Sequence, residues 1–229
     1  MQSLIHTPTN GLENSLTFYN KLGFKSLSNK ERTIVTDGMV VIEINADRFA
    51  RAGVKLFKTK WTKEVNKLKK LTTVHRTKTG YVLGDPNGVW IYLEEGLLKL
   101  KFKPAKESFS VLGNYAGISL ESTDISKSVE VWKTLGFKAK GSPEQGWVAC
   151  TNQDNLTVNI MNPLMCPHLF FNPSLTYFNG KGNSPKVIKK IRELKIPITE
   201  EITHFNDKGV VDNIIIRDPG GYGFFLFND

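Results

Sequence analysis

Two side chains in the first half of the sequence are placed to do chemistry, the carboxylate of Glu43 and the imidazole of His6. Glu43 lies in an alternating segment that predicts a strand, in which Ile42 and Ile44 point to one face and Glu43 to the other. His6 shares a predicted strand face with Leu4. A carboxylate and an imidazole on strand faces can bind a metal ion, transfer a proton or bind a polar group of a ligand. An unpaired buried carboxylate is costly, so either Glu43 has a hydrogen-bond partner, for which His6 is the nearest candidate, or its pKa is raised.

Aromatic residues extend the polar face of the first half. In the predicted strand over residues 89–94, Ile91 and Leu93 point one way, and Trp90, Tyr92 and Glu94 point the other. Aromatic walls with a few polar groups are the usual composition of a small-molecule pocket.

The last strand of the second half, over residues 222–227, is apolar on both faces. Phe225 and Phe227 are therefore expected to fill their own cavity or to pack against the other half.

A phrase that occurs twice defines the elements that position these residues. Residues 12–25 and residues 125–138 align at a constant offset and both end in Leu-Gly-Phe-Lys. Each copy predicts an amphipathic helix, and Gly23 and Gly136 supply the left-handed residue that ends it. Asn10 is the predicted N-cap of the first helix, and Thr123 or Asp124 that of the second.

A second repeated phrase closes each half. Asp85-Pro86-Asn87-Gly88 and Asp218-Pro219-Gly220-Gly221 predict tight turns between two strands, with a structural role only. Further helices are predicted over residues 63–71 and 185–194, so each half runs strand, helix, strands, helix, strands. The longer spacing in the second half predicts an insertion around residues 161–173.

Composition bounds the class of protein. The 229 residues are 40% hydrophobic and 23% charged, which is typical of a globular protein with enough apolar residues for two small cores. No apolar run is long enough to span a membrane and no signal peptide precedes the first strand, so we expect a cytoplasmic protein. Cys150 and Cys166 form no paired motif and are expected to be ordinary thiols. The lysines behind the net charge of +9 are dispersed, which argues against a nucleic-acid partner.

The two phrases together resemble those of the vicinal oxygen chelate superfamily, which contains glyoxalase I, extradiol dioxygenases and the bleomycin or fosfomycin resistance proteins. The resemblance implies an α+β fold of tandem domains, each built from paired βαβββ modules with a curved mixed sheet around a cavity. The first domain is expected over residues 1–98, a linker over 99–112 and the second domain over 113–229.

The resemblance also implies strand positions that hold metal ligands in the metal-using members. The corresponding residues in this sequence are Leu4, Glu43, Gly53, Tyr92, Gly117, Asn159, Ser174 and Phe225. Only Glu43 is a usual ligand, and a divalent ion needs about three or four. We therefore expect no metal and no other cofactor.

In this superfamily the sheet face opposite the helices is the concave cavity. The first cavity is thus expected to bind a ligand through Leu4, His6, Glu43, Trp90, Tyr92 and Glu94. The predicted function is metal-independent small-molecule binding of the glyoxalase or bleomycin-resistance type, without catalytic residues, in a monomer or homodimer. One alternative is a lyase or dioxygenase with an unorthodox metal site or with Glu43 as general base, and another is a non-catalytic interaction module. If the protein binds a small molecule without a metal, Glu43→Gln is expected to leave the fold intact and to weaken ligand binding.

Overall fold

The computed structural model describes residues 1–27, 29 and 31–228, which form two eight-stranded mixed sheets with few helices, an α+β fold. The first sheet contains β1 (Gln2–Pro8), β2 (Lys25–Leu27), β3 (Thr33–Thr36), β4 (Val41–Asn45), β5 (Gly53–Lys58), β6 (Val74–Arg76), β7 (Gly80–Gly84) and β8 (Trp90–Glu95). The second contains β9 (Asn114–Glu121), β10 (Lys138–Ser142), β11 (Trp147–Thr151), β12 (Thr157–Met161), β13 (Ser174–Phe178), β14 (Ile198–Ile202), β15 (Asn213–Arg217) and β16 (Gly223–Phe227). The helices are α1 (Leu12–Lys21), α2 (Thr62–Leu68), α3 (Ile125–Thr134) and α4 (Ser184–Glu193).

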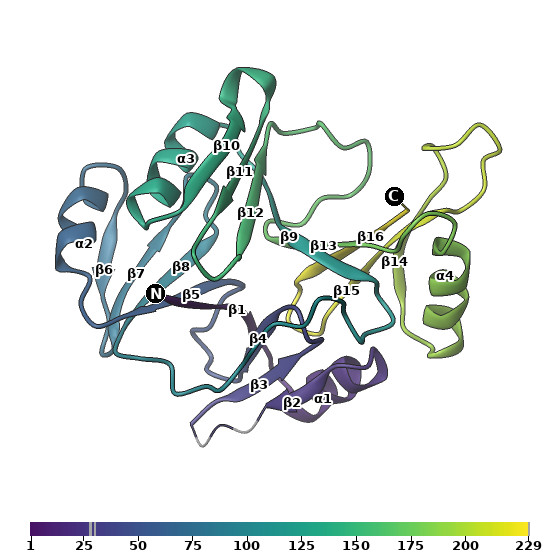
Figure 1. The fold of residues 1–229 in the computed structure, drawn as a ribbon, viewed down its shortest axis with the longest axis horizontal. Helices are drawn as coiled ribbons and strands as arrows, with labels where there is room; N and C mark the ends of the chain where they lie inside the picture. The colour runs from purple at the N-terminus through teal and green to yellow at the C-terminus, as the bar shows by residue number, and fades with distance from the viewer. Residues whose placement is uncertain (28, 30, 229) are drawn as a thin grey trace.

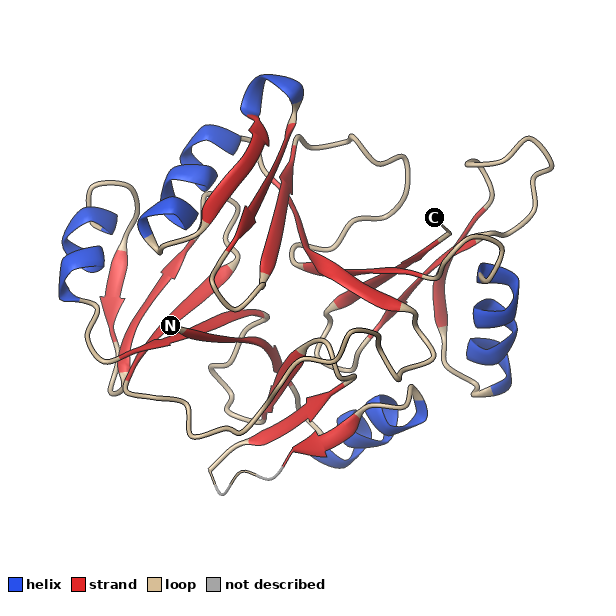
Figure 2. Cartoon of the chain, in the orientation of Figure 1, coloured by secondary structure: helices blue, strands red, loops and turns tan. Residues whose placement is uncertain are grey.

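Both sheets have the same topology. The strand order is β2-β3-β4-β1-β5-β8-β7-β6 in the first sheet and β10-β11-β12-β9-β13-β16-β15-β14 in the second. At the centre of the first sheet, β1 is parallel to β4 and antiparallel to β5. At the centre of the second sheet, β9 is likewise parallel to β12 and antiparallel to β13. Each sheet is therefore a pair of βαβββ modules, as Figures 1 and 2 show.

Most predicted helix signals are confirmed. Gly23 and Gly136 follow the helix ends with φ of +91° and +94°, a backbone conformation that glycine adopts without steric cost. The side chain of Asp124 caps α3 by accepting from the backbone N–H of Lys127. The prediction for α1 was wrong, because Gly11 is its N-cap and no side chain caps it. No helix of the described residues is long and apolar enough to cross a membrane.

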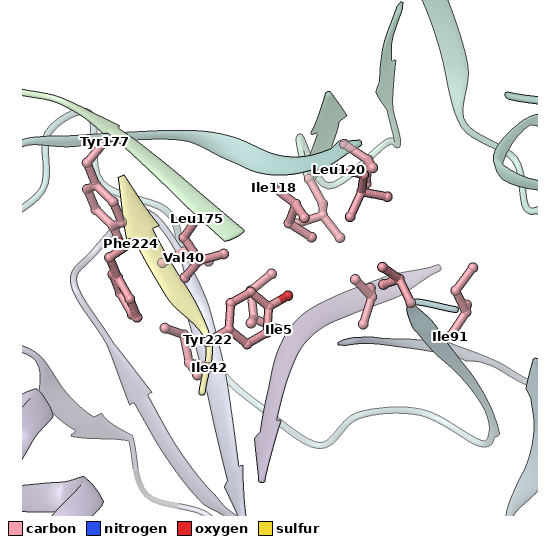
Figure 3. Close-up of a cluster of buried hydrophobic side chains, with 14 of the residues drawn as sticks. Ile5, Val40, Ile42, Ile91, Ile118, Leu120, Leu175, Tyr177, Tyr222 and Phe224 are labelled. Carbon is pink, nitrogen blue, oxygen red and sulfur yellow. The ribbon is translucent and has the colours of Figure 1, made fainter. Parts of the chain in front are cut away.

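The apolar faces of the two sheets form one continuous core. Figure 3 shows Ile5 and Ile42 of the first sheet near Leu175 of the second, and Ile91 on the side of Leu120, and all belong to a single buried cluster. The predicted alternation is thus confirmed, since Ile42 and Ile91 enter the core and their neighbours point away from it. The same core also receives α1, whose Tyr19 lies beside Phe224.

The two Asp-Pro turns connect opposite halves of the chain. Asp218 Oδ2 accepts hydrogen bonds from Thr7 Oγ1 at 2.6 Å and from Tyr19 OH at 2.8 Å, both in the first half. Reciprocally, Asp85 accepts from Ser128 Oγ of α3 at 3.2 Å. The turns were predicted to be structural connections between two strands. The structure adds hydrogen bonds from each turn to the opposite half of the chain.

The segment between the sheets is packed against the first half. Leu98, Leu100 and Phe102 contact the cluster that contains Leu4 and Phe57. The backbone N–H of Ala105 donates to the carbonyl of Gly38, that of Phe109 to Asp37 and that of Val111 to Leu22. The predicted linker therefore covers one side of the first sheet.

Candidate functional site

Strand register brings the predicted first-sheet residues onto one face, opposite the core. His6 pairs with Glu43 across β1 and β4, and Gly53 of β5 pairs with both His6 and Trp90. Leu4 and Tyr92 occupy the next row, where each pairs with Lys55. Glu94 follows two residues after Tyr92 on the same face.

Glu43 is the centre of a buried ion cluster on this face. Its carboxylate is 2.8 Å from Lys55 Nζ and 2.9 Å from Arg32 Nη1, and its side chain and that of Lys55 are almost fully buried. Glu94 completes the cluster at 3.9 Å from Arg32. Burial alone would raise the pKa of Glu43, but the charges of Lys55 and Arg32 outweigh burial and hold the pKa below its usual value. The predicted pairing with His6 was wrong, because two cations take that role.

The imidazole of His6 is engaged at both nitrogens. Asn45 Nδ2 donates to Nε2 at 3.0 Å, which leaves Nδ1 to donate to the carbonyl of Arg51 at 2.8 Å. Burial, followed by the charge of Lys55, lowers the pKa of His6 to about 4, so the ring is neutral at pH 7. The ring packs edge-on against Tyr92.

These donors do not fit a divalent metal ion. A metal at Glu43 would have to displace Lys55 and Arg32, and His6 has no free nitrogen. The equivalent second-sheet positions are Gly117, Asn159, Ser174 and Phe225, which offer neither carboxylate nor imidazole. Among the described residues, no group of three or more histidine, cysteine or acidic side chains could hold a metal ion.

The first face is largely filled. The apolar residues of the linker cover its Leu4 side, and the ion cluster occupies its centre. The aromatic edge is open, since Trp90 is 37% exposed and its ring lies 5.9 Å from that of Tyr92. At the Leu4 end, a cavity of about 480 Å³ remains between the sheet and the linker.

The same face of the second sheet holds an open pocket of about 300 Å³. Ser119 of β9 and Thr176 of β13 lie in it, with their hydroxyl oxygens 2.7 Å apart, and Asn159 pairs with Ser119 in register. The remaining lining is mostly apolar, namely Ala116, Trp147, Met161, Cys166, Phe170, Phe178, Phe225 and Phe227. Phe225 and Phe227 thus line a pocket in their own half, which stays open, whereas they were expected to fill it or to pack against the other half.

The loop over residues 162–173, where an insertion was predicted, covers this second-sheet pocket and contributes Cys166 and Phe170. It is held by Leu169 N–H, which donates to Glu200, and by Asn172, which exchanges two hydrogen bonds with the backbone of Glu121. Burial, with a smaller effect of Glu121, raises the pKa of the Cys166 thiol, which favours its protonated form at pH 7.

Sequence reasoning missed Arg32, Lys55 and Thr176 as residues of these two faces. Lys55 and Thr176 lie on central strands that follow loops, and neither was assigned a role. Lys55 was missed because β5 itself was not predicted, although Val54 and Leu56 alternate with Lys55 and Phe57. For Ser119 a signal does exist, since it alternates with the apolar Ile118 and Leu120 in β9.

Comparisons with known proteins agree on the fold. No protein-family model matches the chain, and no curated protein matches it in sequence. Among solved structures, the 2,3-dioxygenase LapB from Pseudomonas sp. KL28 matches 99% of this chain and 91% of its own, with 15% identity and a TM-score of 0.58. The match to homoprotocatechuate 2,3-dioxygenase from Arthrobacter globiformis covers 99% of this chain and 78% of that protein, with 14% identity and a TM-score of 0.57. The match to the Mn(II)-bound glyoxalase from Novosphingobium aromaticivorans covers 98% of this chain and 80% of that protein, with 13% identity and a TM-score of 0.55.

The chain therefore has the vicinal oxygen chelate fold. In particular, it has the two-sheet form found in extradiol dioxygenases, across its whole described length. The resemblance predicted from the helix and turn phrases is confirmed at the level of the fold.

Proposed function

We propose that this protein binds a small uncharged aromatic molecule in the second-sheet pocket without using a metal ion. The observation that carries the proposal is the contrast between the two faces. The centre of the first is occupied by the Glu43 ion cluster, whereas the centre of the second retains an aromatic-walled pocket with two hydroxyl groups. Its volume lies at the lower end of the range for ligand sites, which suits a ligand of about two fused rings.

The hydroxyl pair defines the polar group of this ligand. Ser119 and Thr176 share one hydrogen bond, which leaves one O–H free to donate and several lone pairs free to accept. A ligand hydroxyl or carbonyl would complete this pair. The lining contains no carboxylate, imidazole or ammonium group, so a charged ligand would be left uncompensated.

We expect 1-naphthol to bind saturably and Thr176→Val to weaken its binding by about 1 kcal/mol, or roughly fivefold, because one hydrogen-bonding hydroxyl is removed. Fluorescence titration measures both affinities, and naphthalene serves as the probe without a hydroxyl. Thr157→Val is the matched control, since Thr157 forms a similar hydroxyl pair with Thr151 outside the pocket.

Equal 1-naphthol affinity in the wild type and in Thr176→Val would show that the hydroxyl pair does not contribute to binding. An equal loss for 1-naphthol and naphthalene would mean that Thr176→Val disturbs the pocket walls instead. Either result contradicts the proposed recognition.

The main rival is an enzyme of the lyase or dioxygenase type. It draws support from the names of the structural neighbours, which include dioxygenases and a Mn(II)-bound glyoxalase. We expect protein purified from cells grown with added manganese, iron and zinc to carry far less than one metal ion per chain after mild dialysis. Elemental analysis measures this content, with Glu43→Gln prepared in parallel. About one ion per chain in the wild type would overturn metal independence, and its loss in the variant would place the ion at Glu43.

The first-sheet face stays a second proposed contact surface. The partly exposed rings of Trp90 and Tyr92 support it, since aromatic faces next to polar groups favour flat ligands. On this face, the rings of Trp90 and Tyr92 would be positioned by Leu4, His6, Glu43 and Glu94. Glu43 would act through its ion pairs with Lys55 and Arg32 instead of through a free carboxylate oxygen.

A further inference from the structure

The second-sheet pocket contains a carboxamide that the hydroxyl pair does not use. Asn159 of β12 lines the pocket, is partly buried and pairs in register with Ser119 of β9. Its side chain forms no hydrogen bond within the part of the chain that the structure describes, and its polar atoms are not sealed from solvent. A carboxamide has two N–H donors and a carbonyl acceptor, so Asn159 presents unused groups of both kinds to a ligand.

Gly117 of β9 determines where this carboxamide lies. The residue has a φ of +142°, and a Cβ added to it would lie 2.8 Å from Asn159 Nδ2. A side chain does not tolerate so short a contact, so the missing side chain of Gly117 leaves the space that the amide occupies. The amide of Asn159 therefore leans across β9, over the floor of the pocket.

The carboxamide and the hydroxyl pair approach the same part of this floor from two sides. In the sheet, β9 lies between β12 and β13, and Thr176 of β13 pairs in register with Gly117. The hydroxyl of Thr176 is shared with Ser119. Since neighbouring strands are about 4.8 Å apart, two adjacent polar atoms of one ligand can reach the amide on one side and the hydroxyl pair on the other.

The two sets of groups ask for different partners. The hydroxyl pair has one O–H free to donate, which a ligand carbonyl accepts. The carbonyl of the Asn159 side chain accepts from a ligand N–H. A site built to bind an N–H discriminates against an analogue that lacks it, because its own polar group is then left without a partner.

We propose that the second-sheet pocket prefers uncharged aromatic lactams, in which a ring C=O lies next to an N–H, and that Asn159 determines this preference. The inference rests on the proposed ligand site and narrows its ligand to one with a second polar group. The lactam carbonyl accepts from the Ser119 and Thr176 pair, the lactam N–H donates to Asn159 Oδ1, and the fused rings pack against the aromatic walls.

The probes for this proposal are isoquinolin-1-one and isocoumarin, two fused-ring molecules of nearly the same size and shape. The first is a lactam, and the second is the lactone in which a ring oxygen replaces the N–H. We expect the wild type to bind the lactam roughly fivefold more tightly than the lactone, the effect of about one hydrogen bond. Isothermal titration calorimetry measures both affinities. The lactam should also displace 1-naphthol from the wild type, which places the two ligands in the same pocket.

Two variants assign the preference to Asn159. Asn159→Leu keeps the branched shape of the side chain, Asn159→Ala cannot clash with a neighbour, and both should lose the preference for the lactam. The ratio of the two affinities is the readout, because a change in the pocket walls affects lactam and lactone alike. Asn66→Leu is the matched control, since Asn66 is exposed on α2 outside the pocket, and it should keep the wild-type ratio.

The outcomes separate this inference from the proposed site. If 1-naphthol binding depends on Thr176 but the wild type binds lactam and lactone equally, the role of Asn159 is overturned and the site stands. A preference that persists in both Asn159 variants, or a lactam that binds without displacing 1-naphthol, overturns that role as well. If none of the three aromatic probes binds saturably, the proposed site itself fails, and the inference fails with it.

Discussion

Glu43→Gln is expected to lower the free energy of unfolding by about 3–5 kcal/mol at pH 7, the usual cost of removing one partner from a buried ion pair. The substitution leaves Lys55 buried without its carboxylate at 2.8 Å, and Arg32 keeps only the longer contact with Glu94. Urea denaturation of both proteins measures the difference. The structure thus reverses the expectation from the sequence, in which this variant keeps its stability.

Two controls separate this effect from a general loss of charge. Glu201→Gln removes an ion pair with Arg192 whose side chains are about half exposed, and it should cost less than about 1 kcal/mol. Glu43→Gln combined with Lys55→Met removes both buried charges and should recover part of the loss. If Glu43→Gln unfolds at the same urea concentration as Glu201→Gln, the cluster does not stabilise the fold.

The effect of Glu43→Gln should also depend on pH. Because the pKa of Glu43 is lowered in the folded protein, its stabilisation is present above the pKa of the unfolded chain and is lost as pH falls through the folded value. The difference between wild type and variant should therefore stay constant from pH 7 to about pH 5 and shrink below about pH 4. A difference that persists in acid would indicate a packing defect instead.

Asp218→Ala is expected to lower the free energy of unfolding by about 2–4 kcal/mol. It leaves Thr7 Oγ1, Tyr19 OH and the N–H of Tyr222 without their acceptor in the interior, and each such loss costs about 1–3 kcal/mol. Burial raises the pKa of Asp218, so removing the carboxylate also removes a desolvation cost, which offsets part of the loss. Thermal and urea unfolding measure the result.

Asp85→Ala is the matched control for Asp218→Ala, since it changes the equivalent turn. Across the halves Asp85 accepts from Ser128 at 3.2 Å, a longer contact than either of those of Asp218, and within its turn it accepts from the N–H of Asn87. Its expected cost is therefore smaller, about 1–2 kcal/mol. Equal losses in the two alanine variants would show that the contact of Asp218 with α1 adds nothing beyond the turn itself.

The sequence predicts much of the fold because its strongest signals are local. The helix that ends at Gly136, the turn at Asp218 and the alternation around Ile42 each follow from neighbouring residues. The strand β5 was not predicted, because its two lysines interrupt the apolar pattern. It is nevertheless a buried strand, since it pairs with a strand on each side. The division into domains over residues 1–98 and 113–229 stays a prediction, because the core is continuous between the sheets.

The site was less predictable because it depends on segments distant in sequence. Alternation placed Glu43 on the correct face, but its partner Lys55 comes from an unpredicted strand. The linker was interpreted as a spacer. Its Leu100 and Phe102, together with Leu98 just before it, alternate with its lysines, which is a signal for one packed face. Whether either concave face stays open depends on this linker and on the loop over residues 162–173, and tertiary packing decides both.

The contact between Asp218 and α1 has a consequence for biosynthesis. Tyr19 and Thr7 leave the ribosome early, but their acceptor lies near the other end of the chain, 199 and 211 residues later. At typical translation rates of about 5–20 residues per second, the nascent N-terminal half waits roughly 10–40 s before α1 can complete its contacts. During that interval the apolar residues beside Tyr19 remain exposed, so the growing chain is a natural client for chaperones until its last strands emerge.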